Sequence, residues 1–184
     1  MFKRFCVALI CSSAAVAAQA DPANVFVSFA VGSADQEISV DNFGSASESN
    51  TTIGVRGGYL FHFDRFYVGP ELSYSENGDF ASDIEETDIE SESLNLGLKA
   101  GFHLVPEKLA LVGRLGLSLW EVSVDSVLGD GERDGEDPYF GLGLEYQIVE
   151  NLVLGASYTM LQFDLDDLTE YEITTPELYF EIRF

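Results

Sequence analysis

The chain has 184 residues, of which 32 are acidic and only 9 are basic, and its net charge is −23. This sign excludes nucleic acid as a partner, because phosphate contacts require an excess of basic side chains. The length fits one domain with its own interior. No run of 18 or more apolar residues follows position 20, so the sequence predicts no transmembrane helix.

Residues 1–20 have the organisation of a signal peptide. A basic MFKR start is followed by an apolar run at 5–16 and by Ala18-Gln19-Ala20, a small-residue cleavage pattern. The sequence therefore predicts an exported protein whose mature part, residues 21–184, is a single domain.

Apolar residues then alternate with small or polar residues in eight stretches, which is the two-residue period of a β-strand. In chain order the stretches are 25–31, 53–63, 66–74, 94–104, 109–119, 140–148, 152–160 and 178–184. The last of them lies within ELYFEIRF (177–184) and keeps its apolar stripe up to the final phenylalanine.

The opposite face of these strands is rich in glycine, serine, threonine and asparagine. Two barrels could use such strands: a soluble barrel with the apolar face inside, or a membrane barrel with that face toward lipid. The interior of an eight-stranded barrel is only wide enough to be filled by side chains, so dozens of large apolar residues would overfill it. The sequence therefore predicts an all-β fold, an eight-stranded antiparallel up-and-down transmembrane β-barrel.

Charged residues within the strands fall on the small, polar face and balance in sign. They are Arg56, Glu71, Lys99, Arg114, Glu145, Glu177, Glu181 and Arg183. Charges in a narrow interior are tolerated when they are paired and hydrogen-bonded. We interpret the eight as a static salt-bridge network that plugs the lumen; the alternative is a gated or slowly conducting core.

The connections between strands are expected to alternate in length. Short ones lie at 63–66, 105–108 and 149–151, and long ones at 33–50, 75–91, 121–138 and 162–176. Outer-membrane barrels have short periplasmic turns and long extracellular loops. We therefore expect the long loops outside the cell and both termini in the periplasm.

Most of the acidic residues fall in the four expected loops. Carboxylate clusters can bind calcium or magnesium, and these ions could bridge to lipopolysaccharide phosphates. The candidate ligands are Asp83, Glu85, Glu86, Asp88, Asp130, Asp134 and Asp137. A hydrated, self-repelling and disordered surface explains the same residues, and we favour it.

Nothing in the sequence indicates an enzyme or a cofactor. Cys6 and Cys11 both lie in the predicted signal peptide, so the mature chain has no thiol chemistry. His62 and His103 are on the lumen face near short turns, where they could approach each other or Tyr67 as packing members or as a pH-sensitive pair. No Gly-rich phosphate loop or Cys/His metal set is present.

The sequence resembles the OmpA-like eight-stranded outer-membrane β-barrel family, which includes porin-family and opacity-type proteins. The resemblance rests on residues 141–146, the turn ending at Asn151, residues 152–158 and the terminal Phe184. It implies an integral outer-membrane location, surrounded by membrane lipid and lipopolysaccharide.

The resemblance also implies that the last strand is a signal for the barrel-assembly machinery. Phe180, Ile182 and Phe184 are its apolar positions, and Glu177 matches a polar one. Tyr179 stands where the family usually has glycine. An inward tyrosine can compensate by covering neighbouring lumen glycines.

Three function hypotheses follow. The first is a structural and surface-interaction role, in which the protein supports envelope integrity and its acidic loops contact ions, lipopolysaccharide or an external ligand. The second is a narrow cation-preferring pore, since an acidic entrance concentrates positive ions. The third is a soluble lipocalin-type binder of small molecules.

Overall fold

The computed structural model describes residues 24–40, 44–82, 87–125, 131–166 and 169–184. It describes side chains within 24–35, 49–76, 91–121, 134–161 and 172–184. The predicted signal peptide lies outside the described residues. The strands are β1 (Val25–Val40), β2 (Gly44–Tyr59), β3 (Phe61–Phe63), β4 (Phe66–Ser82), β5 (Thr87–Val105), β6 (Leu109–Asp125), β7 (Gly131–Val149), β8 (Leu152–Asp166) and β9 (Thr169–Arg183).

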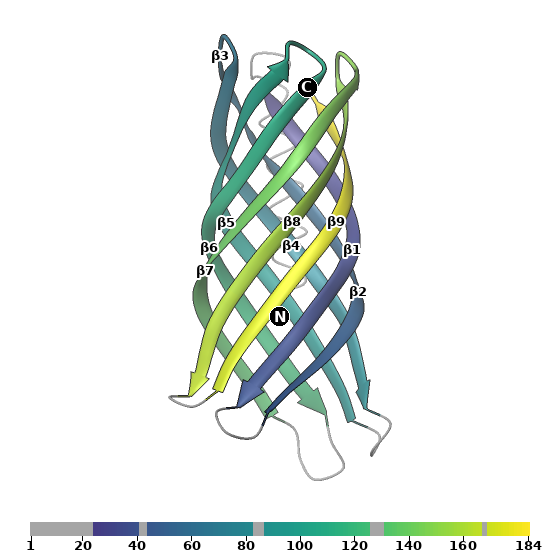
Figure 1. Ribbon diagram of the computed structural model, residues 1–184, viewed down its shortest axis with the longest axis vertical. Helices are drawn as coiled ribbons and strands as arrows, with labels where there is room; N and C mark the ends of the chain where they lie inside the picture. The colour runs from purple at the N-terminus through teal and green to yellow at the C-terminus, as the bar shows by residue number, and fades with distance from the viewer. Residues whose placement is uncertain (1–23, 41–43, 83–86, 126–130, 167–168) are drawn as a thin grey trace.

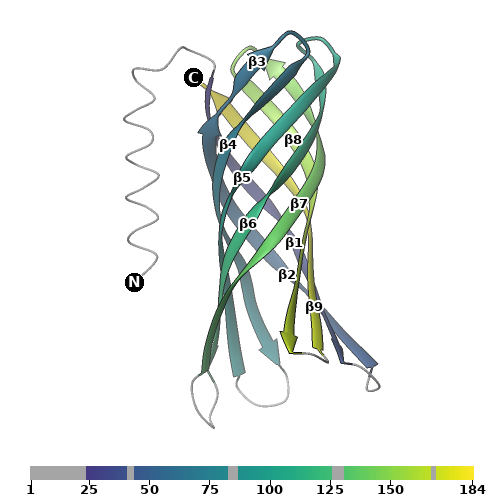
Figure 2. The same ribbon diagram turned by 90° about the vertical axis from the view of Figure 1, so that its left-hand side faces the viewer.

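The strands form one closed antiparallel sheet, seen from two sides in Figures 1 and 2. Its order is β2-β1-β9-β8-β7-β6-β5-β4-β3, and pairing of β2 with β4 closes the barrel. The short β3 continues β2 beyond Leu60, because Gly58 pairs with Glu71 and Phe61 pairs with Val68 in the same register. The wall therefore has eight strands, and the predicted fold class is confirmed.

The strands are longer than predicted. The prediction of four long loops at 33–50, 75–91, 121–138 and 162–176 is therefore wrong. β5 and β7 each have 19 residues, and each of these four regions lies mostly in strands. The prediction ended each strand where apolar alternation stopped. Pairing between strands, however, requires only hydrogen bonds between their backbone groups and does not require contact with lipid. The strands therefore continue into water, where their side chains are polar.

The strands extend further beyond the apolar band at one end of the barrel than at the other. The short-turn end carries the turns after β3, β5 and β7 together with the C-terminus, and the far end carries the extended strands (Figure 1). About 9–11 tilted residues cross a bilayer, so much of each strand except the short β3 projects past it at the far end. Asp64 in the first short turn has a φ of 48°, a left-handed conformation that aspartate tolerates better than most residues.

Candidate functional site

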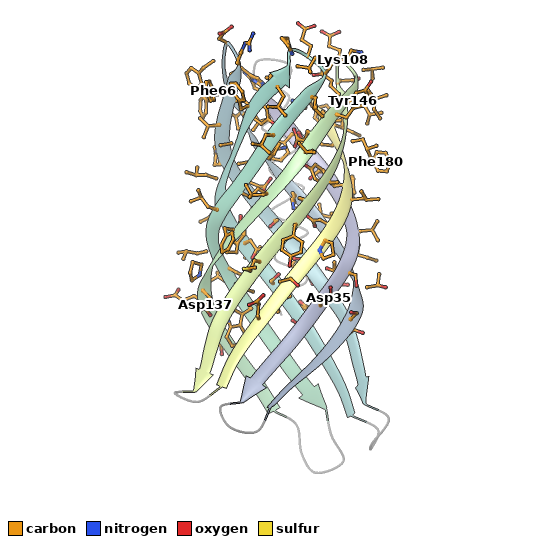
Figure 3. All side chains as sticks on the ribbon, in the orientation of Figure 1. Asp35, Phe66, Lys108, Asp137, Tyr146 and Phe180 are labelled. Atoms are coloured by element: carbon orange, nitrogen blue, oxygen red, sulfur yellow. The ribbon has the colours of Figure 1, made fainter. Side chains whose placement is uncertain are left out.

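The apolar face of the sheet points outward. Leu115, Leu142 and Phe180 are 60%, 64% and 55% exposed, whereas Arg114 and Glu145 are each 3% exposed. Figure 3 shows the side chains of Phe66 and Phe180 pointing away from the barrel. This inside-out arrangement is that of a protein whose solvent is lipid. The lipocalin hypothesis is therefore wrong, because a soluble barrel would bury these residues along its axis.

Aromatic side chains gather on the outer surface at the short-turn end. Exposed members include Phe61, Phe63, Phe66, Tyr146 and Phe184. The rings of Phe66 and Phe102 lie 4.8 Å apart. Membrane barrels carry such aromatic girdles at the boundary between hydrocarbon and water, so this ring marks one edge of the membrane.

The centre of the lumen holds the eight charges predicted from the sequence. Glu145 on β7 is the hub: its Oε1 lies 2.6 Å from Lys99 Nζ and its Oε2 lies 2.6 Å from Arg183 Nη2. The same carboxylate accepts hydrogen bonds from the hydroxyls of Tyr67, at 2.6 Å, and Tyr179, at 2.9 Å. Two cations and two hydroxyls from three strands, β4, β5 and β9, therefore converge on one buried carboxylate.

Glu181 shares both cations of this hub. Arg183 Nε donates to its Oε1 at 2.8 Å, and Lys99 Nζ bonds to its Oε2. Lys99 and Glu181 are both 0% exposed. Burying such groups is costly unless each charge has a partner, and here each has at least one.

Two further ion pairs extend the network. Arg114 Nε lies 3.1 Å from Glu71 Oε1, and both residues are buried. Arg56 bonds to both oxygens of Glu177, which also accepts a 2.5 Å hydrogen bond from Ser157. The structure thus brings together all eight of the predicted charges, as four cations and four carboxylates.

Tyr179 stands among these pairs. Its ring centroid lies 4.8 Å from the Arg114 guanidinium carbon and 5.5 Å from that of Arg56, which are cation–π distances. A Cβ on Gly155, its direct partner on β8, would lie 2.1 Å from the ring. The prediction that an inward tyrosine covers a lumen glycine is confirmed.

Two apolar clusters occupy the lumen on either side of the charges, and the sequence reading missed both. The short-turn cluster is Phe26, Leu60, Tyr67, Ala110 and Val112, and the far-end cluster is Ala34, Trp120, Tyr139, Leu161 and Ile173. The small and polar residues expected on the lumen face therefore share it with large apolar side chains. The sequence does contain an indication of these clusters, because their large apolar residues lie on the same face of each strand as the lumen glycines.

A polar chamber lies between the ion pairs and the far-end cluster, with a volume of about 60 Å³. Its wall is rich in hydroxyl groups, from Thr52, Ser73, Ser75, Ser93, Ser118, Thr159 and Thr175. Arg56 and Glu177 line it as well, and so do Leu161 and Ile173 of the apolar cluster.

The two histidines flank Tyr67 at the short-turn end. Ring centroids are 5.8 Å apart for His62 and Tyr67, and 5.5 Å apart for Tyr67 and His103. His62 Nδ1 also lies 3.1 Å from Asn24 Oδ1. Both rings therefore pack against an aromatic neighbour at the rim of the lumen.

The metal candidates divide between described and undescribed residues. Asp83, Glu85, Glu86 and Asp130 lie outside the described residues, as does the side chain of Asp88. Asp134 is exposed, whereas Asp137 accepts a 2.8 Å hydrogen bond from Trp120 Nε1. These two aspartates are three positions apart and therefore lie on opposite faces of β7, so one ion cannot join them. Within the described residues no group of three or more potential ligands is placed to hold a metal.

Carboxylates also line the outer surface at the far end. Glu76 pairs with Glu92, Glu92 with Glu121, and Glu121 with Asp134, in direct cross-strand register. This carboxylate row crosses β4, β5, β6 and β7. Like charges directly opposite each other in a sheet repel, and the hydroxyl of Tyr74 donates a 3.0 Å hydrogen bond to Glu76 at one end of the row.

The predicted assembly strand, β9, pairs with β1, so the last strand of the chain lies beside the first. Phe180, Ile182 and Phe184 point outward and are 55%, 37% and 53% exposed. The amide of Phe184 donates a 2.8 Å hydrogen bond to the carbonyl of Val25. The three apolar positions therefore form a stripe that lipid or another protein can contact.

These features define a class: an eight-stranded membrane barrel with a filled lumen. Within the described residues, no helix is long and apolar enough to cross a membrane. The sequence matches the family described as outer membrane protein beta-barrel domain over residues 5–184. The chain belongs to this family and is an integral protein of the bacterial outer membrane.

Solved structures agree with this assignment. Neisserial surface protein A is 17% identical, with a TM-score of 0.66 over 86% of this chain and 97% of its own. The N-terminal barrel of Pseudomonas aeruginosa OprF is 18% identical, with a TM-score of 0.61 over 89% of this chain and 100% of its own. At these identities the likeness shows the fold alone.

A third similar structure is the attachment invasion locus protein Ail of Yersinia pestis, solved with the heparin analogue sucrose octasulfate. It is 20% identical, with a TM-score of 0.60 over 88% of this chain and 99% of its own. No curated protein sequence matches the chain.

Proposed function

We propose that this protein is a non-conducting, non-enzymatic barrel that supports envelope integrity and presents an acidic surface outside the cell. The observation that carries the proposal is the filled lumen. Six ion pairs among four cations and four carboxylates occupy its axis together with two apolar clusters, so ions would have to break buried charge contacts to pass. Breaking a buried pair costs about 3–5 kcal/mol.

The expected orientation places the short-turn end and both termini in the periplasm. The short turns support it, because membrane barrels carry their short turns on the periplasmic side. The extended strands would then project outward, bringing the carboxylate row to the level of the lipopolysaccharide headgroups.

Divalent cations are the partners that this surface favours. The carboxylate row and the phosphates of lipopolysaccharide are both anionic, so calcium or magnesium between them would remove two repulsions. The polyanion in the Ail complex belongs to that protein; the net charge of −23 disfavours a polyanionic ligand for this chain.

Conductance of the purified barrel in a planar bilayer tests the plug. We expect no steady current from the unmodified protein. Arg114→Ala should admit intermittent current, because it leaves Glu71 without its guanidinium partner. Leu115→Ala, the adjacent lipid-facing position, is the control and should remain silent. Steady current in the unmodified protein would overturn the proposal.

A cation-preferring pore is the second candidate, and the polar chamber favours it. A hydroxyl-lined space already occupies part of the lumen, so only the ion pairs and the short-turn cluster would separate it from the periplasm. Steady current with a higher permeability for potassium than for chloride would establish this candidate.

A further inference from the structure

At the far end the barrel wall divides into two separate sheets. Pairing of β2 with β4 stops at Ile53 and Glu76, and pairing of β7 with β8 stops at Tyr139 and Leu161. Beyond these points, in the described residues, β8, β9, β1 and β2 remain paired as one sheet, the β2 sheet. The strands β4, β5, β6 and β7 remain paired as the other, the β7 sheet. In Figure 2 the far ends of the β7 sheet lie to the left and those of the β2 sheet to the right.

A local feature of the sequence ends each of the two interrupted pairings. Pro138 is the next residue of β7 beyond its last pair with β8, and proline has no backbone N–H to donate to a neighbouring strand. On the other side, β4 has a register shift between Glu76 and Asp79, directly beyond its last pair with β2. A bulge of this kind bends a strand and increases its twist. The division into two sheets is therefore encoded in β7 and β4.

The division leaves four free strand edges, and three of them carry features that discourage pairing. Proteins protect exposed edges with prolines, charges, bulges and short strands. The free part of β7 has Pro138 and several charged residues, β4 has its bulge, and the free part of β8 is short, 162–166, with two aspartates. The free part of β2, residues 44–51, has no proline, a single charged residue, Glu48, and an unbroken register with β1. Among the described strands, β2 therefore has the edge best suited to accept another strand.

We propose that residues 44–51 of β2 are a docking edge for an extended, basic polypeptide segment of another protein. Every second residue of such an edge directs its backbone N–H and C=O groups away from β1, and a strand that lies alongside pairs with these groups. The edge is long enough for an ordinary strand of about 5–6 residues.

The charge of the β2 sheet selects the partner. Its far-end part comprises residues 33–40, 44–52, 161–166 and 169–176, which include acidic residues such as Asp35 and contain no lysine or arginine. A basic segment is therefore attracted, whereas a second copy of this chain, with its net charge of −23, is repelled. The inference rests on the proposed orientation, which places this edge outside the cell, and it names a partner for the acidic surface.

A synthetic peptide tests the edge directly. The probe is a peptide of about eight residues in which lysine and valine alternate, added at low salt to the folded barrel in nanodiscs of neutral lipid. Its control carries N-methyl groups on its central residues, which retain the charge but remove backbone donors from both edges of the peptide. Nanodiscs without the barrel measure binding to lipid alone.

We expect the probe to slow hydrogen exchange of the backbone amides within 44–51 several-fold and to leave those of 162–166 unchanged. The N-methylated control should bind several-fold more weakly. Equal binding of the two peptides, or no protection within 44–51, would overturn the proposal.

Proline variants of β2 provide a second test. Neighbouring residues of a strand direct their N–H groups to opposite sides, so one of Ala46→Pro and Ser47→Pro removes a donor from the free edge. We expect that variant to lose the protection by the probe, and unboiled gel migration verifies that the barrel is folded. Full binding to both variants would contradict docking at this edge. Conductance tests the plug separately, so failure of the docking test leaves the proposed function intact.

Discussion

Single residues in the lumen are constrained by the aromatic rings that cover them. Gly155 and Gly113 lie on opposite faces of the sheet and offer a direct comparison. The ring of Tyr179 covers Gly155 from inside, whereas a Cβ on Gly113 would meet only Leu142 Cδ2, at 4.0 Å. The lumen therefore requires glycine at one position, and the lipid face does not at the other.

We expect Gly155→Ala to destabilise the barrel by about 1–3 kcal/mol, the usual range for overpacking a filled interior. The added methyl group must displace the Tyr179 ring, which bonds Glu145 and faces Arg114. Gly113→Ala should be close to neutral. Reversible urea unfolding in lipid vesicles measures both, and equal effects of the two changes would contradict the lumen packing described here.

At the scale of the strands, the far half of the barrel is held together in spite of its charges. Glu121 faces Glu92 on one side and Asp134 on the other. Backbone ladder bonds maintain this register, and the facing carboxylates repel one another. A change of charge sign at the middle of the row tests this balance.

Glu121→Lys should stabilise the barrel at low ionic strength by roughly 0.2–1 kcal/mol for each of its two cross-strand contacts. The gain should disappear in about 1 M salt, where the Debye length is about 3 Å. Glu136→Lys is the matched control, because Glu136 faces Leu119 on β6. An equal gain from both lysines would show that total charge, and not the row, sets the stability.

At the scale of the whole molecule, the closing strand β9 links folding to membrane insertion. Phe184 lies at the end of the apolar stripe and is bonded to β1 through its backbone. Its exposed ring adds little to the interior, so its effect on spontaneous folding should be small. A role in recognition by the assembly machinery would appear only in cells.

We therefore expect Phe184→Ala to lower the amount of folded barrel in outer membranes several-fold, with little effect on refolding in detergent. Phe66→Ala is the control: it removes another outward aromatic ring of the short-turn end, 59% exposed, outside the last strand. Heat-dependent gel migration of membrane fractions measures the folded protein. A similar loss in both variants, or a loss in detergent refolding, would assign Phe184 a packing role only.

The membrane part of the fold could be read from alternation because each lipid-facing position must be apolar. The two-residue period, the glycine-rich parity and the balanced charges are all local properties of the sequence. The far-end parts of the strands could not be found in this way. Polar residues such as Glu92 and Glu121 are equally compatible with a loop and with a β-strand exposed to water.

The sequence by itself determined which face of each strand meets lipid, how many strands there are, and which eight charges share the lumen. Only the tertiary structure decided which charge pairs with which, because the partners of Glu145 come from β5 and β9 through the stagger of the closed barrel. It also decided where the apolar clusters and the chamber lie. Side chains that are far apart in the chain meet on the barrel axis, and their contacts depend on register and shear that no local pattern encodes.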